Sequence, residues 1–349
     1  MKIILTLAIL GAATALGLAA DYPPKPNNQM QAVLDQLAAL GGKPIEQLTP
    51  EEARRQPTPG DAVKALLKQR GQSTAPEPVA NVENKSITGP GGEIPIRIYT
   101  PQGHGPFPVI LYIHGGGWVI ANLDTYDSSP RALANATKAI VVSTHYRLAP
   151  EHPFPASHED TYTAYKWVLN NASSFNGDTN RIAVVGESAG GNMAAAISLM
   201  ARKQNVPMPV YQVLIYPVAG VDMNTPSYQE NANAKPLNKA MMEWFVKYEL
   251  NNPQDKQDPR INLLNANLLG LPATTIITAE IDPLRSGGKM LADKLKTAGV
   301  TVDYKNYDGV THEFFGMGAV LDASNDATKL AAKDLSKAFS HIQKYEITR

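Results

Sequence analysis

The stretch RIAVVGESAGGNMAAAISLM, residues 181–200, joins two kinds of secondary structure at a single corner. Its first six residues are typical of a buried strand, and an alanine-rich helical segment begins at Ala189. Between them lies Gly186-Glu187-Ser188-Ala189-Gly190, which is the pattern G-x-S-x-G. At a strand-to-helix corner this pattern presents a serine hydroxyl above the sheet, and the glycines avoid backbone clashes. We therefore predict that Ser188 is a nucleophile; the alternative is a serine that only caps a helix.

The rest of the chain alternates strands and helices in a way that fits this corner. Five helices are predicted at residues 130–137, 159–171, 189–203, 287–298 and 327–345. Strands alternating with helices indicate an α/β fold with an eight-stranded, mostly parallel sheet that is covered by helices on both faces. The eight predicted strands are NVENKSI (81–87), IPIRIYT (94–100), PVILYIH (108–114), AIVVSTH (139–145), RIAVVG (181–186), YQVLIY (211–216), ATTIITA (273–279) and TVDYKNY (301–307).

Two segments lie outside this alternation. Residues 21–80 contain three short helical stretches, MQAVLDQLAAL, TPEEARRQ and GDAVKALLKQR, and precede the sheet. Residues 218–265 interrupt the catalytic domain, which we place at residues 81–349, with a helix around NKAMMEWFVKYEL. An insertion that follows a sheet strand is a candidate lid over a binding site.

Residues 1–20, MKIILTLAILGAATALGLAA, have the features of a secretory signal peptide: an early positive charge, an apolar stretch, and small residues at its end. The alternative is a membrane anchor, but the apolar run from Ile3 to Leu18 is short and diluted for a bilayer span. We expect an exported protein, periplasmic or secreted, without a stable membrane span after the signal is removed. The chain has no cysteine, so disulfides and thiolate chemistry are excluded.

A serine nucleophile needs a base and an acid that orients the base. In the order typical of α/β hydrolases, both follow the serine. Only His312 and His341 come after Ser188, and His341 lies within a predicted helix, so we assign His312 as the base. Asp282 ends a strand and is followed by Pro283, which favours it as the acid. Glu280 and Asp308 are the rival carboxylates.

The glycine triplet Gly115, Gly116 and Gly117 follows the strand PVILYIH. It precedes no helix of the kind that binds phosphate, and strand-like segments on both sides argue against a linker. The backbone N–H groups of Gly116 and Gly117, together with that of Ala189, could instead point at one oxygen. This arrangement predicts an oxyanion hole.

At this point the sequence resembles the hormone-sensitive-lipase-like α/β hydrolases, the bacterial family IV esterases. The resemblance runs from about residue 30 to 343 and implies the same roles for Ser188, His312, Asp282, Gly115 to Gly117 and Ala189. It also implies a cap built from the N-terminal helices and the insertion. Two positions depart from the family pattern: His145 and Ser286 stand where aspartates are usual. The motifs that carry the resemblance are HGGGW (114–118), YRLAPEHPFPAS (146–157), GESAGGN (186–192), LIYP (214–217), DPLRSGG (282–288) and HEFFGM (312–317).

The sequence thus predicts a carboxylic-ester hydrolase that acts through an acyl-enzyme, prefers short acyl chains and needs no cofactor. We place Trp118, Met241, Trp244 and Phe245 at the substrate; packing inside the cap is the alternative for the last three. His152 and His158 lack a metal-binding spacing, so no metal is expected. With 32 basic and 32 acidic residues, nothing indicates a nucleic-acid partner, and a homodimer stays open.

Two other functions remain as alternatives. An amidase or peptidase could use the same three residues, and the motifs do not separate it from an esterase. A non-catalytic small-molecule binding protein on the same scaffold, as in the related plant hormone receptors, would need no complete triad. The presence of His312 argues against such a receptor.

Overall fold

The computed structural model describes residues 24–347, with side chains described as far as residue 340. The expected signal peptide, residues 1–20, lies outside the described part of the chain. The strands are β1 (Asn81–Gly89), β2 (Gly92–Thr100), β3 (Phe107–Ile113), β4 (Ile140–Thr144), β5 (Gly177–Glu187), β6 (Gln212–Ile215), β7 (Thr274–Ile281) and β8 (Val302–Thr311). The α-helices are α1 (Asn28–Ala39), α2 (Pro50–Ala53), α3 (Pro59–Gln69), α4 (Ser128–Thr137), α5 (Ala156–Asn171), α6 (Ala189–Lys203), α7 (Pro226–Glu230), α8 (Lys239–Glu249), α9 (Arg285–Thr297) and α10 (Asp322–Ile347), and the 3₁₀ helices are η1 (Ile45–Gln47), η2 (Ala172–Phe175), η3 (Pro253–Gln257), η4 (Leu263–Asn265) and η5 (Phe314–Gly316).

The eight strands form one sheet in the order β1-β2-β4-β3-β5-β6-β7-β8. β1 pairs antiparallel with β2, and β2 pairs antiparallel with β4, whereas all other neighbours are parallel. This confirms the predicted eight-stranded, mostly parallel sheet. Because β5 lies between β3 and β6, the serine corner that follows β5 lies at the middle of the sheet.

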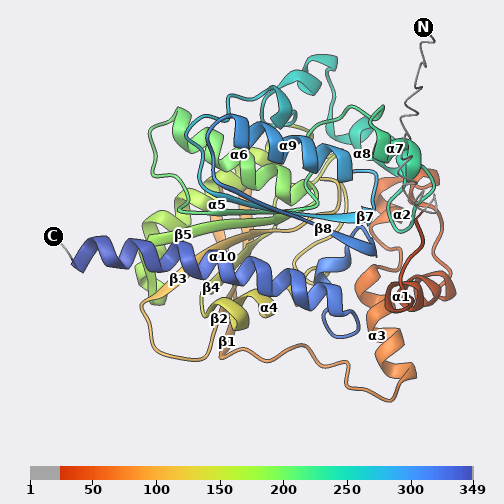
Figure 1. Cartoon of the computed structure of the whole chain (residues 1–349), viewed down its shortest axis with the longest axis horizontal. Coiled ribbons are helices and arrows are strands. Elements are labelled where there is room, and N and C mark those ends of the chain that lie inside the picture. The colour runs from red at the N-terminus through yellow and green to blue at the C-terminus, as the bar shows by residue number, and fades with distance from the viewer. Residues whose placement is uncertain (1–23, 348–349) are drawn as a thin grey trace, which may run out of the picture.

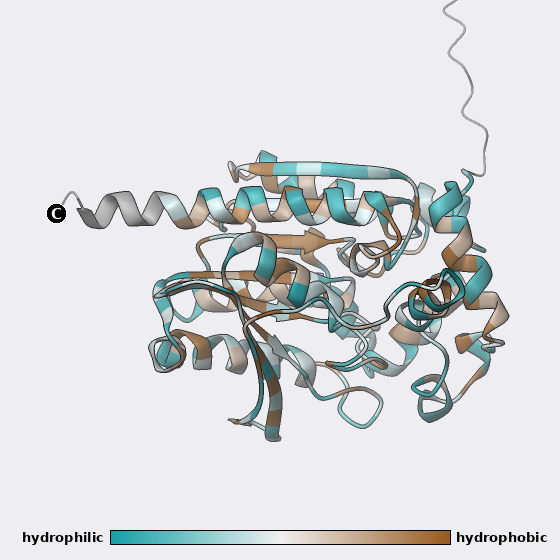
Figure 2. Ribbon diagram, turned by 90° about the horizontal axis from the view of Figure 1, so that it is seen from below, coloured by the Kyte–Doolittle hydropathy of each residue, from teal (hydrophilic) through white to brown (hydrophobic). Residues whose placement is uncertain are grey.

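Helices cover both faces of the sheet (Figure 1). Along β3, Val109, Leu111 and Ile113 belong to one hydrophobic cluster, while Ile110 and Tyr112 belong to a second cluster on the other face. The first cluster includes residues of α5, α6 and α9, and the second includes residues of α4 and α10. This two-sided burial explains why the strands are continuous apolar runs rather than alternating ones. Figure 2 shows the contrast between the hydrophobic strands and α10, whose ribbon carries both hydrophobic and hydrophilic residues.

The last helix begins five residues earlier than the sequence indicated, at Asp322 rather than residue 327. Its first N–H group, that of Asp322, donates to Oε1 of Gln29 at 3.1 Å, and the amide of Gln29 donates back to the Asp322 carboxylate at 3.0 Å. The cap of this helix is therefore supplied from α1, 293 residues away in the chain. Local sequence could not reveal such a partner, so this predicted boundary was wrong.

The start of α1 is also tied to the strand that precedes the last loop. The N–H of Asn27 donates to the carbonyl of Gly309 at 2.8 Å, and the hydroxyl of Thr311 contacts the sulfur of Met30 at 3.4 Å. Figure 1 shows α1, α2 and α3 grouped at one end of the molecule, with α7 and α8 nearby. The N-terminal helices and the insertion between β6 and β7 thus lie at the same end. Within residues 24–347, no helix is both long and apolar enough to cross a membrane.

Candidate active site

The predicted site residues follow four strands of the parallel part of the sheet, all at the same edge. The glycine triplet follows β3, Ser188 follows β5, Asp282 follows β7 and His312 follows β8. These strands run parallel, so the loops after them meet at the carboxyl edge of the sheet. This edge is where α/β folds usually place ligands.

Ser188 has φ 56° and ψ −118°, a strained conformation for a residue other than glycine. The corner around it admits no side chains at the two flanking glycines. A Cβ on Gly186 would lie 2.1 Å from the carbonyl oxygen of Gly190, and a Cβ on Gly190 would lie 2.1 Å from that of Ile113. The backbone is therefore packed tightly enough to hold the serine in its unfavourable conformation.

Ser188, His312 and Asp282 form a continuous chain of hydrogen bonds. The Ser188 hydroxyl lies 2.9 Å from Nε2 of His312, and Nδ1 of His312 lies 2.7 Å from Oδ2 of Asp282. The other oxygen, Oδ1, accepts the N–H of Leu284 at 2.8 Å, which fixes the carboxylate. Donation from Nδ1 to Asp282 leaves Nε2 as the acceptor that faces the serine.

The rival carboxylates lie elsewhere. Oε2 of Glu280 accepts the N–H of Gly309 at 2.7 Å, so this side chain braces the turn before β8 ends. Asp308 accepts from the amide of Asn306 at 2.9 Å and is exposed. His341 falls within α10. Of the candidates considered, Asp282 and His312 are the two that the structure brings to Ser188.

The ring of His312 packs against the ring of Tyr216. The two ring centroids are 4.4 Å apart, and the Tyr216 hydroxyl donates to the buried carboxylate of Glu187. The Tyr112 hydroxyl donates to the other oxygen of Glu187. Burial, and then the charge of Glu313, raises the pKa of Glu187 to about 7. Glu187 therefore anchors the aromatic support of the histidine rather than facing the serine.

The glycine triplet needs its glycines for two different reasons. Gly116 and Gly117 have φ of 92° and 56°, which favours glycine at both positions. A Cβ on Gly115 would lie 2.4 Å from the Tyr126 hydroxyl, and one on Gly117 would lie 2.3 Å from the ring of Phe245. In the described part of the chain, the N–H groups of Gly116 and Gly117 donate to no other group. The N–H of Ala189 lies in the first turn of α6, where helical N–H groups have no intrahelical acceptor.

A buried network holds the loop that carries these glycines. The Tyr146 hydroxyl donates to the carbonyl of Gly115 at 2.9 Å, and Nδ1 of His114 donates to the same oxygen at 2.8 Å. Burial lowers the pKa of His114 to about 3, so its ring is neutral and Nε2 can accept from Nδ1 of His145 at 3.0 Å. His145, a departure from the family pattern, thus extends the hydrogen-bonded support of the loop.

A cavity of about 800 Å³ lies above Ser188 and is lined by α1, the glycine loop and α8. Met241 and Phe245, two of the residues expected at the substrate, line it. Trp118 and Trp244 do not line it, which corrects the expectation for both. The Trp118 side chain is buried in the core, and the indole N–H of Trp244 donates to the carbonyl of Leu48 at 3.0 Å, joining α8 to the segment after η1. At these two positions the large aromatic side chain packs inside the protein and does not face the cavity.

Arg54, at the end of α2, connects the N-terminal helices to the catalytic loops. Its guanidinium donates to the carbonyls of Val119 and Ala149, each at 2.8 Å, and forms an ion pair with Glu151 at 2.7 Å. No local sequence pattern points to this residue, because its partners lie up to 97 residues away. The arginine fixes the N-terminal wall of the cavity against the loop that follows the glycine triplet.

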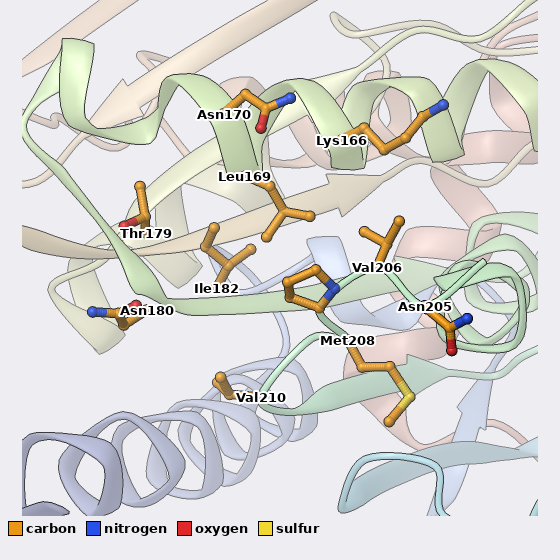
Figure 3. Close-up of a pocket in the computed structure, with 11 residues that line it drawn as sticks. Lys166, Leu169, Asn170, Thr179, Asn180, Ile182, Asn205, Val206, Met208 and Val210 are labelled. Carbon is orange, nitrogen blue, oxygen red and sulfur yellow. The ribbon is translucent and has the colours of Figure 1, made fainter. Parts of the chain in front are cut away.

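A second cavity, of about 570 Å³, lies between α5, β5 and the segment after α6 (Figure 3). Its lining side chains include one cation, Lys166, but no carboxylate or imidazole. It therefore offers no general base and lies apart from Ser188. Among the side chains that the structure describes, no group of three or more histidine, cysteine, aspartate or glutamate residues is arranged to hold a metal ion.

Comparison with known proteins agrees with the fold. A family model described as an alpha/beta hydrolase fold matches residues 110–316. The carboxylesterase NlhH of Mycobacterium tuberculosis is 39% identical over 290 residues, which are 80% of this chain and 91% of that protein. The ethyl acetate hydrolase of Pseudomonas putida is 31% identical over 299 residues, covering 84% of this chain and 92% of that protein. The hyperthermophilic esterase from the archaeon Pyrobaculum calidifontis has a TM-score of 0.81 at 36% identity, covering 90% of this chain and 98% of that one.

Fold, site and similarity together define a serine hydrolase of the α/β hydrolase fold. Within that class, the chain belongs to the hormone-sensitive-lipase-like esterases, bacterial family IV, and is an enzyme of the carboxylesterase type.

Proposed function

We propose that this protein hydrolyses carboxylic esters of short acyl chains through a covalent acyl-enzyme, with Ser188, His312 and Asp282 as the catalytic triad. The observation that carries the proposal is the chain of hydrogen bonds from Ser188 through His312 to Asp282, at 2.9 and 2.7 Å, beneath a cavity that Ser188 itself lines. No step of this chemistry requires a cofactor.

The first half of the reaction forms the acyl-enzyme. His312 takes the proton of Ser188 at Nε2 as Oγ bonds to the ester carbonyl carbon, and Asp282 stabilises the imidazolium. The negative charge that develops on the carbonyl oxygen is received by the N–H groups of Gly116, Gly117 and Ala189. Nε2 then returns its proton to the leaving alcohol as the carbon–oxygen bond breaks. Water repeats the sequence on the acyl group and frees the serine.

Two observations support a preference for short acyl chains. The ring of Phe245 lies directly against Gly117, so the space beside the proposed oxyanion hole is narrow. Helix α1 borders the cavity on one side and helix α8 borders it on another. One of the similar proteins is named for the hydrolysis of ethyl acetate.

We expect p-nitrophenyl esters from acetate to hexanoate to be turned over at least tenfold more efficiently than laurate or palmitate, measured as kcat/KM. Enlarging the space beside Gly117 with Phe245→Ala should shift the optimum to longer acyl chains, because the ring limits the pocket there. The matching p-nitroanilides should react far more slowly. Faster anilide turnover would favour the amidase alternative, and a palmitate optimum would contradict the short-chain proposal.

The acidic side of the pH profile should report His312. Burial alone would lower the pKa of His312. The charge of Asp282, the hydrogen bond to Asp282 and the charge of Glu313 together raise this pKa above its ordinary value of 6.5. Because the base acts only when neutral, kcat/KM should fall as the pH falls through a value above 6.5. In Asp282→Asn the residual activity should show this limb at lower pH. A limb below pH 6 in the unmodified enzyme would contradict the assignment.

A further inference from the structure

Glu313, the residue after His312, has a backbone conformation that glycine would adopt at lower cost. Its φ is 71°, in the left-handed region, and its side chain is long and acidic. Such strain in a non-glycine residue is uncommon and tends to be found at functional sites. The side chain must therefore be considered for a role that glycine could not fill.

The Glu313 carboxylate faces the reactive side of the histidine. Its Oε1 lies 3.7 Å from Nε2 of His312, the same nitrogen that faces Ser188. The Tyr126 hydroxyl donates to this Oε1 at 2.6 Å and holds it in place. Glu313 and Tyr126 both line the cavity, and 21% of the Glu313 side chain is exposed. The two nitrogens of His312 thus face two carboxylates with different surroundings: Asp282 at Nδ1 is fully buried, and Glu313 at Nε2 borders the substrate space.

The distance between Nε2 and Oε1 indicates what lies between them in the reaction. At 3.7 Å the two atoms are too far apart for a direct hydrogen bond. The separation suits a single water molecule that donates one hydrogen to each atom. A carboxylate oxygen has two lone pairs, and Tyr126 uses only one of those on Oε1. Glu187, the other acid near the histidine, is held by Tyr112 and Tyr216 and does not line the cavity.

We propose that Glu313 positions the water that hydrolyses the acyl-enzyme; this inference rests on the proposed ester hydrolysis. The water oxygen bonds to the acyl carbon while one of its protons passes to Nε2 of His312. The second hydrogen stays on that oxygen and is hydrogen-bonded to Oε1 of Glu313. When the bond from the acyl carbon to Oγ breaks, Nε2 returns its proton to Oγ, and the product leaves as the carboxylic acid.

This role separates water from alcohols as acyl acceptors. An alcohol has one O–H, which it must give to Nε2, so the second lone pair on Oε1 of Glu313, the one that Tyr126 does not use, receives no donor. Water satisfies both atoms at once. Glu313 therefore favours hydrolysis over transfer of the acyl group to an alcohol.

The test uses the full-length enzyme with p-nitrophenyl butyrate and added methanol. Rapid mixing gives the acylation rate from the burst of p-nitrophenol and the deacylation rate from the steady state, both normalised to burst amplitude so that only folded enzyme counts. We expect Glu313→Gly, which suits the positive φ, to slow hydrolytic deacylation about tenfold and to raise the ratio of methyl butyrate to butyric acid by a similar factor. Acylation should change less than twofold. Glu313→Ala is the control for backbone freedom. It should give the same deacylation rate and product ratio as Glu313→Gly, which would show that the effect does not come from a loop loosened by glycine.

Glu313→Gln is the decisive comparison, because it removes the charge but keeps an oxygen acceptor. It should restore most of the hydrolytic rate and the partition ratio of the unmodified enzyme. Asp308→Asn, on β8 and outside the cavity, controls for loss of a nearby carboxylate. If Gly and Gln variants slow acylation and deacylation equally and leave the partition unchanged, Glu313 only stabilises the imidazolium and the inference is overturned. Failure of the unmodified enzyme to turn over any ester would instead refute the proposed function.

Discussion

Ser188→Ala should lose roughly 10⁵- to 10⁶-fold in kcat towards p-nitrophenyl butyrate, because the oxygen that attacks the ester is removed and only the binding and oxyanion groups remain. The hydroxyl donates to Nε2 of His312 at the wall of the cavity. Steady-state kinetics measure the loss, and thermal unfolding checks that the fold is kept. A variant that retained a tenth of the activity would show that another residue is the nucleophile.

The proposed acid, Asp282, gives a matched pair of variants for the same experiment. Asp282→Asn should reduce kcat about 10⁴-fold, because an amide at this position favours the wrong tautomer of His312. Glu280→Gln, two residues earlier, contacts the N–H of Gly309 and should leave kcat within about threefold. The reverse pattern would assign the acid to Glu280.

Gly116→Ala should reduce kcat about 10²- to 10³-fold while KM changes little. The added Cβ would lie 2.2 Å from the carbonyl oxygen of Ile120, and the φ of 92° disfavours alanine. The loop must therefore shift, and its N–H groups should no longer point at the carbonyl oxygen of the substrate. In the proposed mechanism the charge that these N–H groups receive exists only in the transition state, so substrate binding should be retained. Steady-state kinetics give both constants.

Gly71→Ala is the control for this substitution. Gly71 also has a positive φ, of 67°, but no atom lies within 4 Å of an added Cβ, and the residue does not line the cavity. It should lower stability slightly without changing kcat. Equal changes in kcat and KM for Gly116→Ala would mean that the triplet only shapes the pocket.

Much of the fold could be predicted because its signals are local. The strands of a parallel sheet are buried on both faces, so they occur in the sequence as unbroken apolar runs such as PVILYIH. The corner at Ser188 requires glycines at fixed offsets, which the structure explains by the 2.1 Å approach at Gly186 and at Gly190. The start of α10 could not be predicted, because Gln29 caps it from the other end of the chain.

The candidate site divides in the same way. Chain order and the ends of strands pointed to Asp282 and His312, and these two side chains meet Ser188 in the structure. Pocket walls depend on which face of a helix or loop turns inward, and an aromatic residue in the sequence does not reveal that. Trp244 therefore turned out to hold Leu48, while Phe245 beside it faces the cavity. Arg54 and Glu313 were missed because their importance lies in partners and distances.

The contact between α1 and the end of β8 has a consequence for how the enzyme gains its activity during folding. Met30 and Thr311 are 281 residues apart, and the loop with His312 begins directly after Thr311. Contacts over so long a separation close late, because the chain must first lose the freedom of a very large loop. A partly folded chain with a finished central sheet would have Ser188 in its corner but no wall and no settled histidine. During refolding, ester turnover should therefore return after the sheet has formed, which makes catalysis a reporter of the last long-range docking step.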